Sequence, residues 1–164
     1  MKKLTLLIGG ICLAAASWAQ TWPNQPIKLV VPYPPAGATD VVAREIAEKV
    51  GTANGWTFVV DNKPGAGGNI GIDAVVKSKP DGHTLAVGQT SNLAINPTLY
   101  TKVPYDSLKD ITPIAFITQQ PVVVVVKADS PFKTLDDLVK AGKSKNDLTM
   151  ASAARGTDGN MEGK

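Results

Sequence analysis

The sequence has little of what metal sites and nucleophilic catalysts require. Its 164 residues contain one cysteine and one histidine. Cys12 lies in an apolar leader, so the mature protein would contain no disulfide, no thiol nucleophile and no cysteine metal site. His83 follows Asp81-Gly82 in a predicted turn and has no obvious catalytic partner. Metal-ligand spacing and a G-x-S-x-G elbow are absent as well, so we expect no metal and no cofactor.

The sequence also lacks a large excess of charge of either sign. The chain has 17 basic and 14 acidic residues, for a formal net charge of +3. Loss of Lys2 and Lys3 with the leader would bring that charge closer to zero. Basic clusters with interleaved aromatic side chains do not occur, so we expect no nucleic-acid partner. Beyond the leader, no apolar run is long enough for a transmembrane helix.

Residues 1–19 have the pattern of a signal peptide. Two lysines precede an apolar run over residues 4–16, which is too short to span a bilayer comfortably. Ser17-Trp18-Ala19 places small residues at the two positions that a signal peptidase reads. We therefore predict export, with cleavage after Ala19.

Short apolar runs alternate with helix-periodic segments along the rest of the chain. Strands are predicted at 27–31, 56–61, 84–88, 111–118, 121–127 and 148–152. Helices are predicted at 39–50, 69–77, 93–99 and 132–141, the last with Thr134 as its cap. Five consecutive valines at 122–126 suggest a central strand. The alternation predicts an α/β fold with a parallel sheet and right-handed crossovers.

The turn between the first strand and the first helix is the segment around which the chain is organised. Ala36-Gly37-Ala38 leads into an amphipathic helix, and Thr39 or Asp40 is the predicted N-cap, because its side-chain oxygen can accept a backbone N–H. The N-terminus of a helix that follows a strand favours small anions. This stretch alone leaves open a capped turn without a ligand.

A second glycine-rich segment, residues 65–71, also follows a strand and opens a helix, as in dinucleotide-binding proteins. Its spacing is one residue longer than the dinucleotide fingerprint, and Gly88-Gln89 stands where an acidic residue should end the next strand. We predict instead that these glycines permit a tight turn and close packing of the helix.

Small polar loops follow three predicted strands, at residues 33–40, 88–96 and 152–157. In an open α/β sheet, ligands bind at the carboxyl ends of the strands. The loops offer backbone N–H groups, hydroxyls and amides, but no nucleophile and no metal site. They predict a binder for a small polar anion rather than a catalyst.

These loops and their surroundings closely resemble the Bug-type periplasmic solute receptors, or TctC family, which are the substrate-binding components of tripartite tricarboxylate transporters. The matching stretches are WPNQPIKLVVPYPPAGATDVVAR, VVDNKPGAGGNIGIDAVVKSKPDGHTL, INPTLYTKVPYD, KDITPIAFITQQPVVVVV with the following TLDDL, and MASAARGT. The resemblance implies a periplasmic-binding-protein-like (Venus flytrap) α/β fold with parallel-rich sheets and a ligand between two lobes. Typical ligands of the family are small carboxylates: di- and tricarboxylates, acidic amino acids and aromatic acids.

Carried over residue by residue, the resemblance places ligand contacts in all three loops. They are Tyr33, Gly37, Ala38, Thr39 and Asp40 in the first, Gln89, Thr90, Ser91 and Asn96 in the second, and Ser152, Ala153, Gly156 and Thr157 in the third. Residues 20–117 would form most of the first lobe and residues 118–164 the start of the second. The partners implied are a small carboxylate and the inner-membrane transporter subunits, and we expect a monomer.

Two departures from the family pattern have consequences. Ala36 stands where the family usually has glycine, so a positive φ there would strain the alanine by about 1 kcal/mol or more. The chain is also roughly half as long as a family member, so we interpret it as C-terminally truncated, with an incomplete second lobe. The alternatives are an exported α/β enzyme that acts on a small acid, and a truncated fragment without function.

Overall fold

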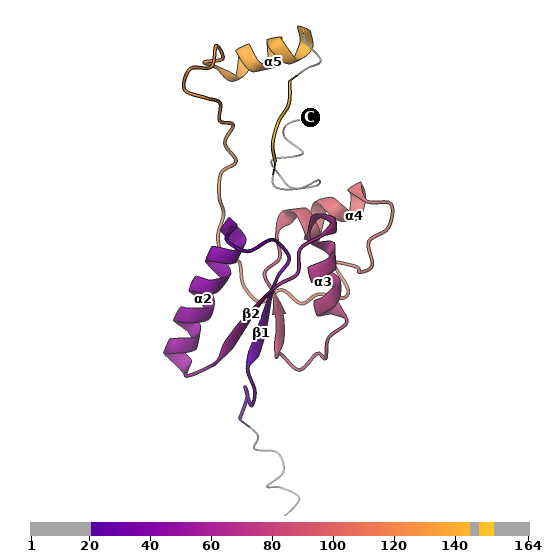
Figure 1. The fold of residues 1–164 in the computed structure, drawn as a ribbon. Helices are drawn as coiled ribbons and strands as arrows, with labels where there is room; N and C mark the ends of the chain where they lie inside the picture. The colour runs from indigo at the N-terminus through magenta and orange to yellow at the C-terminus, as the bar shows by residue number, and fades with distance from the viewer. Residues whose placement is uncertain (1–20, 145–147, 153–164) are drawn as a thin grey trace, which may run out of the picture.

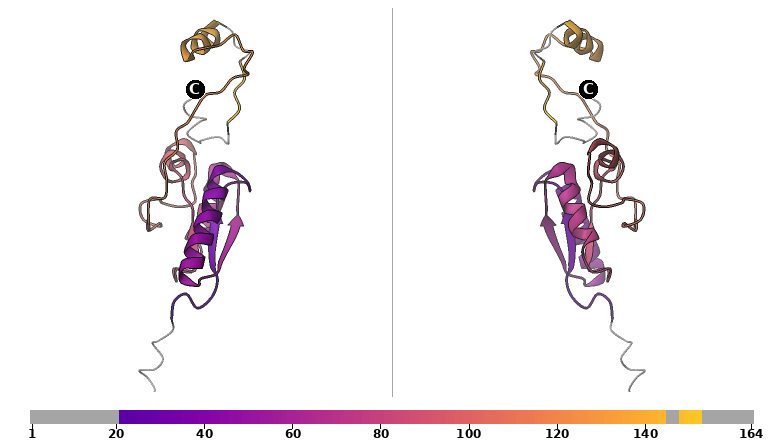
Figure 2. Two further views of the ribbon diagram at one scale, coloured as in Figure 1. Left: turned by 90° about the vertical axis from the view of Figure 1, so that its left-hand side faces the viewer. Right: turned by 90° about the vertical axis from the view of Figure 1, so that its right-hand side faces the viewer.

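The computed structural model describes residues 21–144 and 148–152 (Figure 1). The predicted signal peptide lies outside these ranges, as do three predicted site residues, Ala153, Gly156 and Thr157. A compact α/β part is followed by an extended stretch of chain that leads to a separate helix (Figures 1 and 2). Among the described residues, no helix is long and apolar enough to cross a membrane.

The compact part is built on a parallel sheet with the strand order β2-β1-β3. Its strands are β1 (Ile27–Val31), β2 (Phe58–Asn62) and β3 (Thr84–Ala86). Ile27 pairs with Phe58 on one side of β1, and Lys28 pairs with Thr84 on the other. The predicted alternation of strands and helices and the parallel sheet are confirmed. β2 begins two residues later than predicted, and β3 ends two residues earlier.

β1 is the central strand, and its four apolar residues are at most 6% exposed. Leu29 and Val31 pack against Ala43 of α2 (Ala38–Asn54) in the main hydrophobic cluster. Because side chains alternate across a strand, Val30 faces the other side of the sheet, where its burial also requires cover. α3 (Asn69–Val76) contacts β1 and β3, so the two helices flank the sheet (Figure 1).

The ends of α2 differ from the prediction. Gly37 is the N-cap, and neither Thr39 nor Asp40 takes that position, because the helix already begins at Ala38. At the other end, Gly55 adopts a left-handed conformation with φ 68°, and its N–H bonds to the carbonyl of Gly51. This is the usual glycine stop, and it lets α2 run beyond the predicted end.

The segment after β3 combines a π-helical turn, η3 (Ser91–Ile95), with the short helix α4 (Asn96–Leu99). The sequence predicted one short helix there, interrupted by Pro97. Proline lacks an N–H, so it is tolerated in the first turn of α4, where that donor would have no helical partner.

Beyond the compact part, the structure forms α5 (Leu135–Ser144) but no strand in residues 100–144 or 148–152. The predicted strands at 111–118, 121–127 and 148–152 are therefore wrong for this structure. A strand needs a neighbour for its backbone groups, and the five valines remain 45% to 81% exposed instead. Thr134 does cap α5, since its hydroxyl accepts the Asp137 N–H while the Asp137 carboxylate accepts the Thr134 N–H.

Candidate functional site

The candidate site lies at the carboxyl ends of the three strands, where the loops after β1, β2 and β3 meet. The loop after β1 leads into α2, the loop after β2 contains the short 3-10 turn η2 (Ala66–Gly68), and the loop after β3 leads into η3. η2 and η3 contact one another. Sequence reasoning chose the first and third of these loops and interpreted the second as packing alone.

Side chains predicted to bind ligand join the loops after β1 and β3. The hydroxyl groups of Tyr33 and Ser91 lie 2.5 Å apart, and Gln89 Nε2 donates a hydrogen bond to Thr39 Oγ1. Ser91 is only 1% exposed, whereas the other three are half-buried. Thr90, the helical residue between Gln89 and Ser91, is exposed. The two loops therefore form one connected polar surface.

The first turn of α2 opens onto this surface. Gly37 and Ala38 are exposed, Thr39 is half-buried, and no side chain caps the helix in the part of the chain described. The free N–H groups and the positive end of the helix dipole therefore remain available to a small anion. Hydroxyl groups of the same surface could donate further hydrogen bonds to a carboxylate.

Asp40 is not the N-cap that the sequence predicted, and its carboxylate has other partners. It sits in the first turn of α2, is 3% exposed, and accepts hydrogen bonds from the Ala36 N–H at 2.9 Å and from Arg44 Nε at 3.0 Å. Asn62 Nδ2 donates to the other carboxylate oxygen at 2.9 Å and also to the carbonyl of Tyr33 at 3.1 Å. Hydrogen bonds from Arg44, Ala36 and Asn62 hold the pKa of the Asp40 carboxyl far below its usual range. The carboxylate thus holds the first loop in place.

The loop conformation that Asp40 supports is strained at one residue. Ala36 has φ 64°, in the left-handed region that alanine rarely adopts. The Asp40 carboxylate accepts the N–H of this same residue. The positive φ that the family resemblance suggested is confirmed.

A buried polar cluster beneath the loops was missed by sequence reasoning. Asn69, Asn92, Asn96 and Tyr105 are each at most 7% exposed. Asn96 Nδ2 lies 2.7 Å from Asn69 Oδ1 and 3.0 Å from the Gly67 carbonyl, and the Tyr105 hydroxyl lies 2.9 Å from Asn69 Oδ1 and 2.6 Å from the Asn92 carbonyl. Burial raises the pKa of Tyr105 to about 12. Asn96, a predicted ligand contact, is therefore enclosed within the compact part of the structure.

The glycines of residues 65–71 allow the loops to approach this closely. Gly68 has φ 94°, and a Cβ on it would lie 2.7 Å from Asn92 Nδ2. A Cβ on Gly71 would lie 2.7 Å from Pro32 Cβ. The prediction of a tight turn with close helix packing is confirmed.

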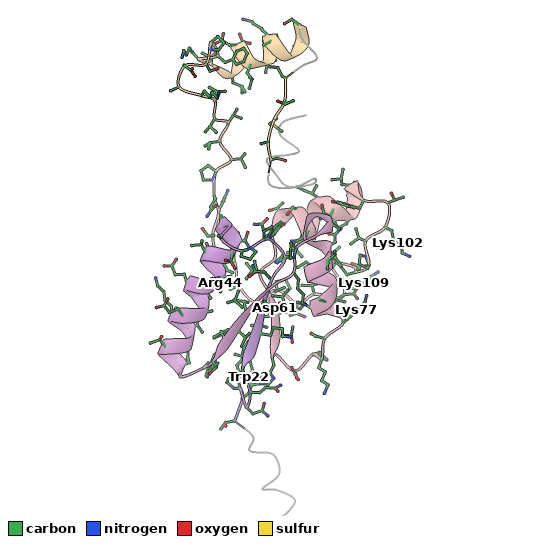
Figure 3. The ribbon with its side chains drawn as sticks, in the orientation of Figure 1. Trp22, Arg44, Asp61, Lys77, Lys102 and Lys109 are labelled. Carbon is green, nitrogen blue, oxygen red and sulfur yellow. The ribbon has the colours of Figure 1, made fainter. Side chains whose placement is uncertain are left out.

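His83, for which the sequence indicated no catalytic role, lies away from the joined loops. His83 is buried, with Nδ1 3.3 Å from Asp81 Oδ1 and its ring 5.7 Å from that of Trp22. Figure 3 shows Trp22 at the amino ends of the strands, whereas Arg44 of α2 lies toward their carboxyl ends. A hollow of about 250 Å³ beside His83 is lined by none of the predicted site residues. Within residues 21–144 and 148–152, no group of three or more His, Cys, Asp or Glu side chains could hold a metal ion.

The third predicted loop is described only in part. Ser152 is exposed and belongs to no helix or strand. The structure therefore brings together the first two loops of the predicted site, and residues 153–157 of the third lie outside the described residues.

Solved structures define the class of protein. The periplasmic binding protein BugD superposes with a TM-score of 0.73 at 31% identity, over 87% of this chain and 48% of its own. Rpa4515 from R. palustris with adipate, and MatC from Rhodopseudomonas palustris with bound malate, each give a TM-score of 0.71, at 34% and 33% identity. They cover 76% and 75% of this chain, and 42% of each is matched. The fold is that of a periplasmic binding protein, as predicted.

Sequence relatives identify the family. Residues 42–162 match the profile of TctC, the tripartite tricarboxylate transporter family receptor. Protein BugT of Bordetella pertussis (strain Tohama I) is 36% identical over 167 residues, 98% of this chain and 51% of BugT. The UPF0065 protein in the tcbD-tcbE intergenic region of Pseudomonas sp. (strain P51) is 40% identical over 158 residues, 92% of this chain and 47% of that protein. The chain belongs to the TctC receptor family, and it spans about half the length of these curated relatives.

Proposed function

We propose that this chain is part of a periplasmic receptor that binds a small carboxylate and delivers it to the inner-membrane subunits of a tripartite tricarboxylate transporter. The observation that carries the proposal is the exposed first turn of α2 beside the joined pairs Tyr33–Ser91 and Thr39–Gln89. Free N–H groups, a helix dipole and hydroxyl donors meet there, which is the chemistry a carboxylate requires. Two structures with the same fold contain adipate and malate.

The predicted site residues divide into two roles in this proposal. Direct contacts come from the N–H groups of Gly37, Ala38 and Thr39 and from side chains of the joined loops, including Gln89 and the exposed Thr90. Asp40 and Asn96 hold the loops in position rather than contact the ligand, because their side chains form hydrogen bonds inside the lobe. The opposite side of the ligand would be covered by Ser152, Ala153, Gly156 and Thr157. Typical ligands would be di- and tricarboxylates, acidic amino acids or aromatic acids.

The proposal includes the domain division expected from the sequence, with the first lobe over residues 20–117 and the second lobe starting at 118. The packing of β1, β2 and β3 with α2 and α3 supports it. The proposal includes export to the periplasm, with the signal peptide cleaved after Ala19. An enzyme acting on a small acid gains no support from the described residues, because the His83 ring lies 5.7 Å from that of Trp22. Trp22 lies at the amino ends of the strands, away from the joined loops (Figure 3).

Calorimetric titration of the chain purified after export, with malate and with adipate, tests the proposal. We expect Thr39→Val to weaken binding by about fivefold or more, because a hydroxyl beside the helix N-terminus is lost. Thr52→Val, at the exposed far end of the same helix, is the matched control and should bind as the wild type does. A cooperatively folded wild-type chain that binds neither acid, or two variants with equal affinity, would contradict the assignment.

A further inference from the structure

Asn62 connects the two parts of the first loop that the proposed carboxylate site uses. It is the last residue of β2, and it pairs with Val31, the last residue of β1. Its side-chain Nδ2 donates to the Tyr33 carbonyl at 3.1 Å and to Asp40 Oδ1 at 2.9 Å. Tyr33 lies just after β1, and Asp40 lies in the first turn of α2. One side chain of a strand therefore joins the two ends of the loop.

The orientation of the Asn62 amide is determined by its neighbours. Arg44 Nη2 donates to Asn62 Oδ1 at 3.0 Å, and Arg44 Nε donates to Asp40 Oδ2 at 3.0 Å. The oxygen of an amide side chain only accepts hydrogen bonds, and its nitrogen only donates them. A reversed amide would place its nitrogen against the guanidinium and its oxygen against the Tyr33 carbonyl and the Asp40 carboxylate. The side chains of Arg44, Asn62 and Asp40 thus form a closed ring of hydrogen bonds that permits one orientation of Asn62.

The loop has little other support of its own. Residues 34–38 are all exposed, and Ala36 holds the unfavourable φ of 64°. By contrast, Asn62 is held in the sheet, where the next N–H along the chain, that of Lys63, donates to the Val31 carbonyl at 2.8 Å. Groups placed on strands are held more precisely than groups placed on loops. Without Asn62, the loop would therefore be free to leave its strained conformation.

We propose that Asn62 is a positioning residue for the carboxylate site. It fixes the spacing between Tyr33 and the first turn of α2, so that the ring of Tyr33 and the N–H groups of that turn form one surface before a ligand binds. A preorganised loop binds more tightly, because the ligand does not have to order it. Asn62 acts through the loop, since both N–H bonds and the oxygen of its amide already have partners. This inference rests on the proposed function and adds a residue that sequence reasoning did not select.

Calorimetric titration of the exported full chain with malate and with adipate tests the inference, together with hydrogen exchange of the ligand-free chain. Asn62→Ala removes every hydrogen bond of the side chain. We expect the dissociation constant to rise by about tenfold. The N–H of Ala36, which bonds to the Asp40 carboxylate, should exchange about tenfold faster, because the loop opens more often.

Val60→Ala, on the same strand, is the control for overall stability. Val60 packs against the hydrophobic cluster, so this change weakens the core without removing a hydrogen bond of the loop. We expect its affinity for both acids, and the exchange of the Ala36 N–H, to stay within about twofold of the wild type. Urea unfolding verifies that both variants are folded.

Arg44→Lys is a milder variant that decides the question if Asn62→Ala does not fold. It keeps the positive charge at an exposed position, but one ammonium group cannot donate to Asp40 and Asn62 with the geometry of the guanidinium. We expect the affinity to fall by about threefold and the Ala36 N–H to exchange faster. Wild-type affinity and exchange in Arg44→Lys would contradict the ring of hydrogen bonds as the support of the loop.

The outcomes separate this inference from the proposed function. Equal loss of affinity in Asn62→Ala and Val60→Ala would overturn the inference, because only overall stability would then matter. Weaker binding with unchanged exchange of the Ala36 N–H would overturn it too, since Asn62 would then act on the ligand directly. Faster exchange with unchanged affinity would show that binding needs no preorganised loop. A folded wild-type chain that binds neither acid contradicts the proposed function itself, and this inference with it.

Discussion

The hydroxyl group of Tyr33 lies 2.5 Å from that of Ser91, although 58 positions separate the two residues in the chain. Tyr33 follows β1 and Ser91 begins η3, so this contact ties together two loops that the sheet brings to the same edge. Asn92 Nδ2 donates to the same phenolic oxygen at 3.2 Å. The position of the Tyr33 ring is thus fixed from the other loop before any ligand binds.

Replacing Tyr33 by phenylalanine should loosen this junction. The change removes the hydroxyl that Ser91 and Asn92 contact, so we expect the free energy of unfolding to fall by about 1 kcal/mol. Urea unfolding of Tyr33→Phe, Ser91→Ala and the double variant measures the effect. The double-variant cycle should give a coupling of about 0.5 to 1 kcal/mol. Additive effects of the two single changes would show that the hydroxyl pair contributes no stability of its own.

Ala36→Gly should stabilise the protein. Alanine at φ 64° carries a steric cost that glycine does not, and this outweighs the extra freedom that glycine gives the unfolded chain. We expect the free energy of unfolding to rise by up to about 1 kcal/mol, measured by urea unfolding. Ala53→Gly, an exposed position inside α2, is the matched control and should lower it by about 1 kcal/mol. A loss of stability in both variants would contradict the strain at Ala36.

The sequence predicted the parts of the fold that depend on local pattern. Apolar runs bounded by turns located β1, β2 and β3, and the helical period located α2 and α3. Parallel strands end at one edge, so the meeting of the loops at 33–40 and 88–96 followed from the order of elements alone. The strained φ at Ala36 was expected from the family pattern rather than from the residue itself.

The sequence could not predict features that depend on partners far along the chain. Asp40 was predicted as a cap, but its carboxylate accepts hydrogen bonds from Arg44 and from Asn62, and Asn62 belongs to β2. Asn69 and Tyr105 are 36 positions apart, and their contact lies beside η3, since the Tyr105 hydroxyl also donates to the Asn92 carbonyl. The strand predicted at 121–127 has the right residues, but a strand forms only where a neighbouring strand pairs with it.

Because of Asp40, the free energy of unfolding should depend on pH. Its pKa in the folded protein is lowered from the ordinary value of 3.8, chiefly by the hydrogen bond from Arg44 and then by that from the Ala36 N–H. A lowered pKa in the folded state stabilises the protein at pH values above that of the unfolded carboxyl. This contribution should therefore be full at pH 6 and decline as the pH falls below about 4.

Unfolding of wild type and Asp40→Asn by urea, from pH 7 to pH 2, measures that dependence. We expect the wild type to be the more stable protein at neutral pH and the difference to shrink steadily below about pH 4. Asp136→Asn, on the exposed helix α5, removes one acidic charge without a buried partner and serves as the control. A difference between wild type and Asp40→Asn that stays constant down to pH 2 would show that the charge of Asp40 is not involved.

Gly71→Ala should separate α3 from the loop after β1. A Cβ at this position would lie 2.7 Å from Pro32 Cβ and 2.8 Å from Pro32 Cα, and backbone cannot yield as a flexible side chain can. We expect the free energy of unfolding to fall by about 1 to 3 kcal/mol, which outweighs the helix propensity gained with alanine. Gly142→Ala in α5 has its nearest neighbour at 3.7 Å and should leave stability unchanged or slightly raised.

The same pair of variants also tests whether ligand binding depends on the close packing of α3. If α3 must lie this close for Tyr33 and Asn92 to meet, Gly71→Ala weakens malate binding as well, whereas unchanged affinity would mean that the binding surface needs only the loops after β1 and β3.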